Sequence, residues 1–509
     1  MTLPIHDTPL AQAPGVPEPR SGGWNEALTA ALIPASGSSE VLSRLRQPGA
    51  LVVTTGQQPG LFTGPAYAVS KALSARALAL ELARRWGRPV IPMYWIPGDD
   101  HDFEEAASAA WLAGDGDLMR ATLEARPADA PLTPMSRQRL GNSVLTALEA
   151  FEQSLPASEG RDRTVDWLRR HYTPEHTVAG AFGAAMAELL APLGVACFDS
   201  THAVVKAAAA PLLLGALRDA GAIDRELASR AARLVAEGTD PGVPVGEGAA
   251  LVFLEDAEGR DRLVLEGGGL QTRRGRRAVP PEELDAIARE QPERLSANVL
   301  LRPVLESFLL PTAAYVAGPG ELRYLALAAP LYQRLGVPRQ RPVPRWSGLL
   351  IEPRVTRVLT KFSATLDELM DEGGGLEARL ARQALPPGTE DAFRELRAAI
   401  EAGFDPVVRL AAQVDPTLER PAASARAQAL FGTQELEKKL LQHARKREAT
   451  ELQQVARARL SVRPEGKPQE RVLSMAGFLG RYGWDLLETL SRHIDTWYAR
   501  ALEAVPPSA

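Results

Sequence analysis

The sequence is poor in cysteine and lacks long apolar runs. Its 509 residues include one cysteine, Cys197, which cannot form an intrachain disulfide. The apolar run 195–198 around it favours a buried strand residue over a reactive thiol. No charged segment followed by an apolar one marks a secretory signal, and no apolar run reaches the roughly 18 residues of a membrane span. We therefore expect a protein of the reducing cytoplasm.

An excess of positive charge is also missing. The chain carries 58 Lys and Arg residues against 63 Asp and Glu residues, a formal net charge of -5. Such a balance gives no general attraction to nucleic acid or to an anionic membrane, so neither is an expected partner. The length is too great for one ordinary core, and it predicts a large α/β body with insertions and at least one further module.

A βαβ unit opens the predicted body. Residues 51–55 form an expected strand that ends in the Gly/Pro-rich stretch 56–65. Residues 66–86 form an expected helix, and residues 89–96 a second strand that is apolar enough to be buried on both faces. The acidic cluster 98–106 follows this strand directly. Because ligands of open parallel sheets bind at the carboxyl ends of the strands, both loops should face one crevice.

Two insertions interrupt the alternation of strands and helices. Residues 113–190 are mostly helical in pattern, and residues 220–297 contain a β-hairpin around the Asp-Ala-Glu-Gly turn 256–259. The alternation then resumes, and a last strand is expected within residues 343–353. These elements predict an α/β core with a parallel sheet over residues 1–354.

From about residue 355 the pattern is helical, and residues 355–460 predict an antiparallel helical hairpin. We expect a turn at Asp415, Pro416, Arg420 and Pro421, followed by a second helix over 424–460 with Leu436 and Leu440 on its inner side. Apolar residues of the first arm recur with the heptad spacing of a coiled coil: Phe393, Leu396, Ile400, Phe404, Val407, Ala411, Val414 and Leu418.

The second arm carries few large apolar residues, so the hairpin alone would bury little surface. Pairing with a second copy would supply the missing surface, and an arm packed wholly against its own body is the alternative. Pro406 lies within the first arm and should kink it. Residues 461–509 are aromatic enough to dock back on the body.

The Gly/Pro-rich stretch after the first strand is a candidate binding loop. Its glycines would let the backbone approach an anion closely, and its neutral polar side chains add hydrogen-bonding groups. The loop matches neither GxGxxG nor GxxxxGK[ST], and a loop that merely turns the chain is the alternative. The candidate residues are Gly56, Gln57, Gln58, Gly60, Thr63 and Gly64.

The acidic cluster combines Asp99, Asp100 and Asp102 with His101. It could hold a cationic amine, bind a divalent metal, or raise the basicity of the imidazole so that it acts as a general base. The alternative is a helix start in which one Asp is the N-cap and the following glutamates favour the helix dipole. Zinc is not expected, because adjacent residues cannot all converge on one tetrahedral ion.

A third strand-to-helix junction repeats the theme with Gly318, Gly320 and Glu321, beside Tyr324. Upstream, Asn298 and Arg302 stand in an otherwise apolar run. Arginine suits a substrate carboxylate or phosphate, and a structural salt bridge is the equal alternative.

Four strings occur in the order TGQQPGLFTGPAYAVSKALSA, PVIPMYWIPGDDHDFEE, SANVLLRPVLESFLLPTAAYVAGPGELRYLA and QERVLSMAGFLGRYG. Together they resemble the signature segments of the bacillithiol biosynthesis cysteine-adding enzymes over nearly the whole chain. The resemblance implies a Rossmann-like core with connective-peptide insertions, similar to class I aminoacyl-tRNA synthetases, and a C-terminal coiled coil through which members dimerise. It also implies the joining of cysteine to the glucosamine amine of glucosaminyl-malate, and an adenine nucleotide in a separate pocket.

These expectations combine into one hypothesis. The first and third junctions bind the malyl carboxylates and sugar hydroxyls, His101 takes the proton of the attacking amine with support from Asp100 or Asp102, and Asp99 positions the amine. ATP would activate the cysteine carboxyl, with Mg²⁺ as a suitable companion ion. The rivals are a nucleotidyl transferase or adenylate-forming enzyme acting on another amino acid, and a non-catalytic coiled-coil scaffold that binds a sugar or nucleotide.

Overall fold

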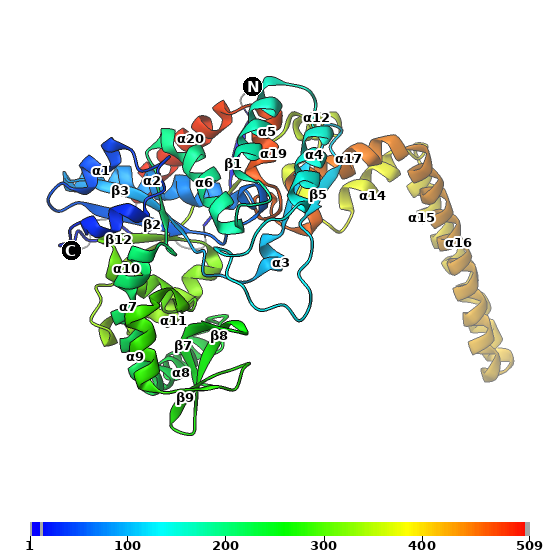
Figure 1. Ribbon diagram of the computed structural model, residues 1–509. Coiled ribbons are helices and arrows are strands. Elements are labelled where there is room, and N and C mark those ends of the chain that lie inside the picture. The colour runs from blue at the N-terminus through cyan, green and yellow to red at the C-terminus, as the bar shows by residue number, and fades with distance from the viewer. Residues whose placement is uncertain (1–2, 11–13, 504–509) are drawn as a thin grey trace. The chain divides into compact units, whose positions relative to one another are not determined.

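The computed structural model describes residues 3–10 and 14–503, and the chain divides into two compact units (Figure 1). The first unit comprises Met1–Leu350 and Pro468–Ala509, and the second comprises Ile351–Lys467. The predicted tail is therefore divided between the units, because residues 461–467 belong to the second unit. Within the described ranges, no helix is long and apolar enough to span a membrane.

The first unit is built on an open sheet of five parallel strands, as a Rossmann-like fold requires. Its central strands are buried along their whole length, which explains their continuous apolar sequences. The chain adds strands on one side of β2 and then crosses to the other side, so the order reverses between β2 and β12. The spatial order is β13 (Arg341–Pro344), β12 (Thr312–Ala317), β2 (Leu51–Gly56), β3 (Val90–Ile96) and β6 (Ala196–Asp199).

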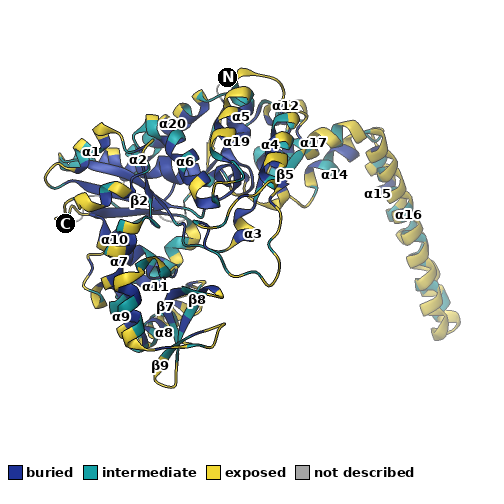
Figure 2. Ribbon diagram, in the orientation of Figure 1, coloured by how far each residue is buried: buried dark blue, intermediate teal, exposed yellow. Residues whose placement is uncertain are grey.

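Helix α2 (Tyr67–Trp86) connects β2 to β3 and is buried on most of its surface (Figure 2). The last helix of the chain, α20 (Asp485–Glu503), packs along α2, where the Arg76 guanidinium pairs with the Asp495 carboxylate at 2.6 Å. The segment after residue 468 thus completes the first unit.

The remaining helices of this unit cover the sheet or belong to the insertions. They are α1 (Ser39–Leu45), α3 (Phe103–Ala106), α4 (Ser143–Ser154), α5 (Glu159–His171), α6 (Val178–Leu190), α7 (Ala203–Arg218), α8 (Ala220–Ala236), α9 (Pro281–Glu290), α10 (Arg302–Leu309), α11 (Pro319–Arg334), α18 (Gln469–Val472) and α19 (Met475–Tyr482).

The second insertion contains more strand than its sequence predicts. The hairpin turn at Asp256–Gly259 is where we expected it, but the hairpin belongs to an antiparallel sheet of five strands. The three added strands have only two to four residues each, so their alternation is too short to read from sequence. The sheet order is β10 (Ala278–Val279), β9 (Gly269–Thr272), β8 (Gly259–Glu266), β7 (Ala249–Asp256) and β11 (Leu295–Ala297).

Two further predictions need correction. Residues 108–122 form an antiparallel pair, β4 (Ser108–Leu112) with β5 (Leu118–Thr122), at the start of a segment predicted to be mostly helical. The expected last strand is divided, because β14 (Gly348–Leu350) leaves the core sheet and pairs with β1 (Ile5–Asp7).

The second unit contains the predicted helical hairpin of α15 (Thr389–Val414) and α16 (Glu419–Arg447). Its turn is shorter than expected, since Arg420 and Pro421 lie in the first turn of α16, where proline is tolerated. The second arm ends at Arg447 and α17 follows, so the predicted helix 424–460 is wrong as a single element. The other helices are α12 (Pro353–Lys361), α13 (Leu366–Met370), α14 (Gly375–Gln383) and α17 (Ala449–Val462).

The hairpin itself is largely exposed (Figure 2). Phe393 is buried, and Leu440, which is 38% exposed, lines a small pocket with it on the predicted inner side. Leu436 is 51% exposed, so its expected inner position is wrong for the single chain. The buried core of this unit lies instead among α12, α13, α14 and α17, around Val355, Leu369 and Val455.

Candidate active site

A cavity of about 610 Å³ opens at the carboxyl ends of the parallel strands, at the reversal of strand order. Its wall includes Gly56–Gln58 after β2, Asp99 and Asp100 after β3, and Gly318–Glu321 after β12. Helices α2, α7, α10 and α18 and the insertion sheet contribute further residues. The crevice that the sequence predicts is therefore present, and it is the site to which open α/β sheets direct their ligands.

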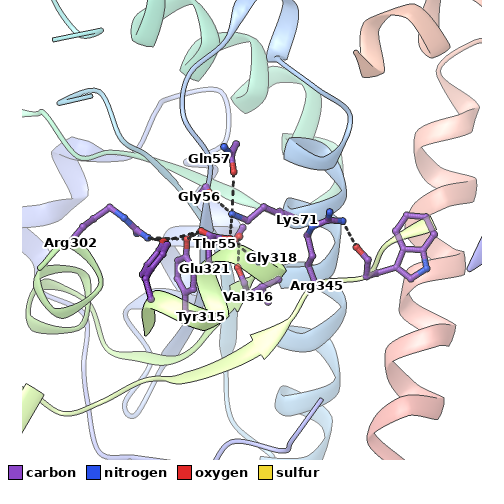
Figure 3. A network of polar contacts seen from close by, with 12 residues as sticks. Thr55, Gly56, Gln57, Lys71, Arg302, Tyr315, Val316, Gly318, Glu321 and Arg345 are labelled. Atoms are coloured by element: carbon purple, nitrogen blue, oxygen red, sulfur yellow. Dashed lines mark hydrogen bonds and ion pairs between the residues drawn. The ribbon is translucent and has the colours of Figure 1, made fainter. Parts of the chain in front are cut away.

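A buried ion pair between Lys71 and Glu321 lies at the floor of this cavity (Figure 3). The Lys71 ammonium, on α2, donates to the Glu321 carboxylate at 2.6 Å, to the Gly56 carbonyl oxygen and to the Gln57 amide oxygen at 3.4 Å. Its side chain is 1% exposed. All three ammonium protons have acceptors, so Lys71 ties the end of β2 to the start of α11.

The Glu321 carboxylate is committed to protein contacts. It accepts the Gly318 backbone N–H at 2.7 Å as the capping residue of α11, and the Tyr315 hydroxyl at 2.7 Å. Burial alone would raise the pKa of Glu321, but Lys71 and the Gly318 N–H outweigh it and hold this pKa below its usual value. Glu321 therefore organises the wall as an ionised group.

Arg302 forms the structural salt bridge that one of its two predicted alternatives requires, and it also faces the cavity. Its guanidinium pairs with the fully buried Glu306 carboxylate at 3.0 Å and donates to the Tyr315 and Tyr324 hydroxyls at 3.1 and 3.2 Å, yet it also lines the cavity. Asn298 lines the cavity too, but its amide oxygen already accepts two backbone N–H groups at the start of α10. Only its amide N–H groups remain for a ligand.

The three carboxylates of the acidic turn after β3 make different contacts. Asp99 pairs with the ammonium of Lys206, a buried residue of α7, at 2.9 Å. Asp102 is the N-cap of α3, as the capping alternative predicts, and accepts the Glu105 N–H at 3.3 Å. Asp100 accepts the Asp102 N–H through one oxygen and faces the cavity.

The expected increase in the basicity of His101 is wrong. Its Nδ1 lies 2.9 Å from Nη1 of Arg260, which comes from strand β8 of the insertion. Burial and then the Arg260 charge hold the pKa of His101 below its ordinary value, against the weaker opposing effect of Asp100 and Asp102. His101 is also absent from the cavity wall. A general base strengthened by neighbouring carboxylates therefore does not fit this position.

The second half of the first loop is packed into the protein rather than exposed in the cavity. Thr63 is fully buried, and its N–H donates to the Tyr172 hydroxyl at 2.7 Å. Gly64 has a left-handed φ of 66°, and a Cβ on Gly60 would come within 3.0 Å of the Gly64 Cα. Gly60, Thr63 and Gly64 thus shape the turn, whereas Gly56, Gln57 and Gln58 line the cavity.

Sequence reasoning missed most of the cationic groups in the wall. Lys71 and Lys206 could have been noticed, since each is a single lysine within an apolar helical run. Among the arginines, only Arg302 is indicated by its apolar context. Arg260 and Arg262 have no local signal because they lie on the insertion sheet, and Arg345 has none because its partner lies in the returning tail. The wall contains eight cationic residues against the four carboxylates of Asp99, Asp100, Glu105 and Glu321: Lys71, Lys206, Arg260, Arg262, Arg302, Arg323, Arg345 and Arg471.

The returning tail contributes to the wall through a buried ion pair. The Arg345 guanidinium binds both carboxylate oxygens of Glu470, at 2.8 and 2.5 Å. Beside it, the Gln469 side chain pairs with the backbone of Leu350 in both directions at 2.9 Å, and the Ser474 hydroxyl donates to the Phe62 carbonyl oxygen. These contacts explain why the late string QERVLSMAGF accompanies the site.

Cys197 is expected to be chemically inert in the folded protein. It is fully buried in β6, and burial raises the pKa of its thiol to about 12. An aromatic disulfide reagent at pH 8 should therefore leave the folded chain unmodified and react fully once the chain is unfolded in guanidinium. Reaction of the folded chain at the rate of a free thiol would contradict this assignment.

Known proteins resemble the chain over most of its length. The family model described as bacillithiol biosynthesis BshC, N-terminal Rossmann-like domain, matches residues 29–346, and that of the BshC C-terminal coiled-coil domain matches residues 348–499. Relatives carry the provisional name cysteine ligase BshC. That of Koribacter versatilis is 34% identical over 451 residues, covering 88% of this chain and 82% of its own. That of Symbiobacterium thermophilum is 32% identical over 476 residues, covering 90% and 85%.

Proposed function

Because the chain belongs to the bacillithiol biosynthesis BshC family of ligases, we propose that it joins the carboxyl group of L-cysteine to the glucosamine amine of glucosaminyl-malate, the last step of bacillithiol biosynthesis. The observation that carries this proposal is the excess of cationic side chains in the cavity at the strand reversal. A malyl group has two carboxylates, and arginine is the side chain best suited to bind a carboxylate through two parallel hydrogen bonds.

The amine end of the substrate requires a different environment. Asp100 and Glu105 line the cavity, and both lie in or just after the turn that follows β3. We assign the ammonium group to this side and the malyl carboxylates to the side of Arg302 and Arg323. Gln57 and Gln58 supply neutral groups for the sugar hydroxyls between them.

Amide formation also needs an activated carboxyl group, because a free carboxylate is a poor acyl donor. ATP would transfer an adenylyl group with release of pyrophosphate, or a phosphoryl group with release of ADP, to a cysteine carboxylate oxygen. That oxygen then departs with the transferred group, as AMP or phosphate, when the amine attacks the carbonyl carbon. The amine must lose a proton in this step. We place the reaction in the cytoplasm, where the substrate thiol stays reduced.

We assign the adenine nucleotide to a second cavity of about 1080 Å³. Guanidinium groups suit phosphates, and the apolar side chains of Leu10, Val16 and Leu322 in the same wall suit a base. The cationic lining consists of Arg20, Arg323, Arg339, Arg341 and Arg345, against the single carboxylate of Glu18.

Replacing Arg341, which is exposed on β13, by alanine should weaken ADP binding about tenfold or more, the loss of one charge-assisted hydrogen bond. Isothermal titration calorimetry with ADP measures this directly. The matched control is Arg262→Ala, which removes an arginine from the first cavity only. An unchanged Kd for ADP in Arg341→Ala, or an equal loss of ADP affinity in both variants, would contradict the assignment of the nucleotide to the second cavity.

We further propose that two copies pair through the α15–α16 hairpin. The support is a series of exposed apolar side chains that a single chain leaves in water: Leu396, Val407, Leu410, Val414, Leu418, Phe431, Leu436 and Leu440. Sedimentation equilibrium should give twice the chain mass, and a Val414→Glu, Phe431→Glu variant should sediment as a single chain.

The proposed substrate assignment is tested by titrating glucosaminyl-malate into the protein without nucleotide. Binding should weaken about 10-fold to 100-fold in Arg323→Gln, an exposed cavity residue whose loss leaves no buried charge. Glucosamine lacking the malyl group should bind weakly to both proteins. Equal binding of the two ligands would contradict the carboxylate subsite, and binding of another amino acid with pyrophosphate release would favour the rival adenylate-forming activity.

A further inference from the structure

The acidic turn Asp99–Asp102 is held by side chains from four separate parts of the chain. These contacts fix a turn that would otherwise be a short exposed loop at the cavity wall. They are Lys206 to the Asp99 carboxylate at 2.9 Å, Arg260 to His101 Nδ1 at 2.9 Å, Arg126 to the His101 carbonyl oxygen at 3.0 Å, and Gln58 to the Asp102 carbonyl oxygen at 3.0 Å.

Arg260 is itself held in place. Its Nε donates to the Ser296 hydroxyl at 2.8 Å, its Nη2 donates to the Ala297 carbonyl oxygen at 3.0 Å, and its guanidinium lies 3.8 Å from the centre of the Phe253 ring. The residue is 7% exposed. The insertion sheet thus presents one fixed guanidinium N–H to the turn.

This contact determines where the imidazole proton lies. A guanidinium group has only donors, so Nδ1 of His101 must be the acceptor. A neutral imidazole carries one proton, which then resides on Nε2. A doubly protonated ring would place two donors and two positive charges against each other at 2.9 Å.

We propose that Arg260 is a positioning residue, which holds His101 as the neutral Nε2–H tautomer and thereby fixes the Asp99–Asp102 turn for substrate binding. The insertion sheet therefore contributes a residue that the active site of the core requires. With its proton on Nε2 and its Nδ1 lone pair occupied by Arg260, His101 does not accept the proton of the amine. The link to substrate rests on the proposed function, whereas the tautomer does not.

The charges around this pair define its pH dependence. His101 faces the cations of Arg260 and Arg126 and the carboxylates of Asp100 and Asp102, and Arg260 also faces Asp99, Arg262 and Glu255. The pKa of His101 lies below its ordinary value in the folded chain, so the contribution of the neutral ring to the free energy of unfolding is fully present above the ordinary histidine pKa. This contribution is lost as the pH falls below that value.

The first test is ¹⁵N NMR of the full-length protein labelled at histidine, with His101 assigned by its loss in His101→Gln. At pH 8 the wild type should show a protonated Nε2 and an unprotonated Nδ1. Arg260→Met should mix the tautomers and raise the His101 midpoint by about one pH unit. Arg262→Met is the matched control, because Arg262 lies on the same strand and over the same Phe253 ring without bonding His101.

A protonated Nδ1 in the wild type would overturn the proposal, as would equal shifts in the two arginine variants. The second test compares His101→Gln, whose amide oxygen can still accept from Arg260, with His101→Leu. A positioning role predicts that Gln keeps kcat/KM within about tenfold of the wild type while Leu loses more. A general base predicts equal losses of about 10² to 10⁴ in both. If the wild type forms no product, the NMR result alone decides the tautomer.

Discussion

Replacing Lys71 by methionine should lower the free energy of unfolding by about 3–5 kcal/mol, the usual cost of removing one partner from a buried ion pair. The change leaves the Glu321 carboxylate without its cation and the Gly56 carbonyl oxygen without its donor. The side chain of Lys71 is 1% exposed, so water cannot replace these contacts without local opening. Denaturant unfolding followed by circular dichroism gives the loss.

The pH dependence of this loss identifies its cause. The pKa of Glu321 is held below its usual value in the wild type, so the stability that it contributes is present above the ordinary carboxyl pKa and declines as the pH falls through the folded value. Without Lys71, burial favours the protonated acid. The difference in the free energy of unfolding between Lys71→Met and the wild type should therefore become smaller at acid pH.

The matched control is the double variant Lys71→Met, Glu321→Gln, which leaves no uncompensated charge and should recover part of the loss. A single variant that loses less than about 1 kcal/mol, with no change in this value between neutral and acid pH, would contradict the account of the ion pair.

Gly56→Ala should destabilise the protein by about 1–3 kcal/mol and displace the loop that carries Gln57 and Gln58. A Cβ at this position would lie 2.6 Å from the Trp95 carbonyl oxygen on the neighbouring strand β3, which is too close for any real contact. The two strands would have to separate at the cavity floor, where the Gly56 carbonyl oxygen accepts from Lys71.

The chain offers a control in the same cavity. Gly320 lies in the first turn of α11, and a Cβ there would meet nothing within 4 Å. Gly320→Ala should leave stability unchanged or raise it by up to about 1 kcal/mol. Thermal unfolding of both variants, beside titration with glucosaminyl-malate, separates a packing requirement at Gly56 from a general need for glycine. Equal stability of Gly56→Ala and Gly320→Ala would contradict the packing requirement at Gly56.

Local pattern was sufficient for the parallel core. Continuous apolar runs identified β2, β3 and β12, and the polar loops that follow them meet at one cavity because parallel strands end at the same edge. The heptad spacing likewise identified the α15–α16 hairpin. Both patterns could be read because they depend on residues that are neighbours in sequence.

The site chemistry was less accessible because it depends on contacts between distant segments. Asp99 and His101 are adjacent to other acids in the sequence, which suggested a strengthened base, but their partners are Lys206 and Arg260, 107 and 159 residues away. Thr63 reads as a ligand in a glycine loop, yet Tyr172 occupies its N–H. Pairings of this kind have no local signature, so periodicity and turn chemistry do not reveal them.

The most direct test of the proposed ligase is mass spectrometry of the purified protein incubated with glucosaminyl-malate, ¹³C-labelled cysteine, Mg²⁺ and ATP, beside a mixture without ATP. A ligase of this specificity should form a product with the mass of the two substrates less one water, carrying the label and appearing only with ATP. A folded protein that binds glucosaminyl-malate but forms no such product in any mixture would contradict the proposed ligase activity.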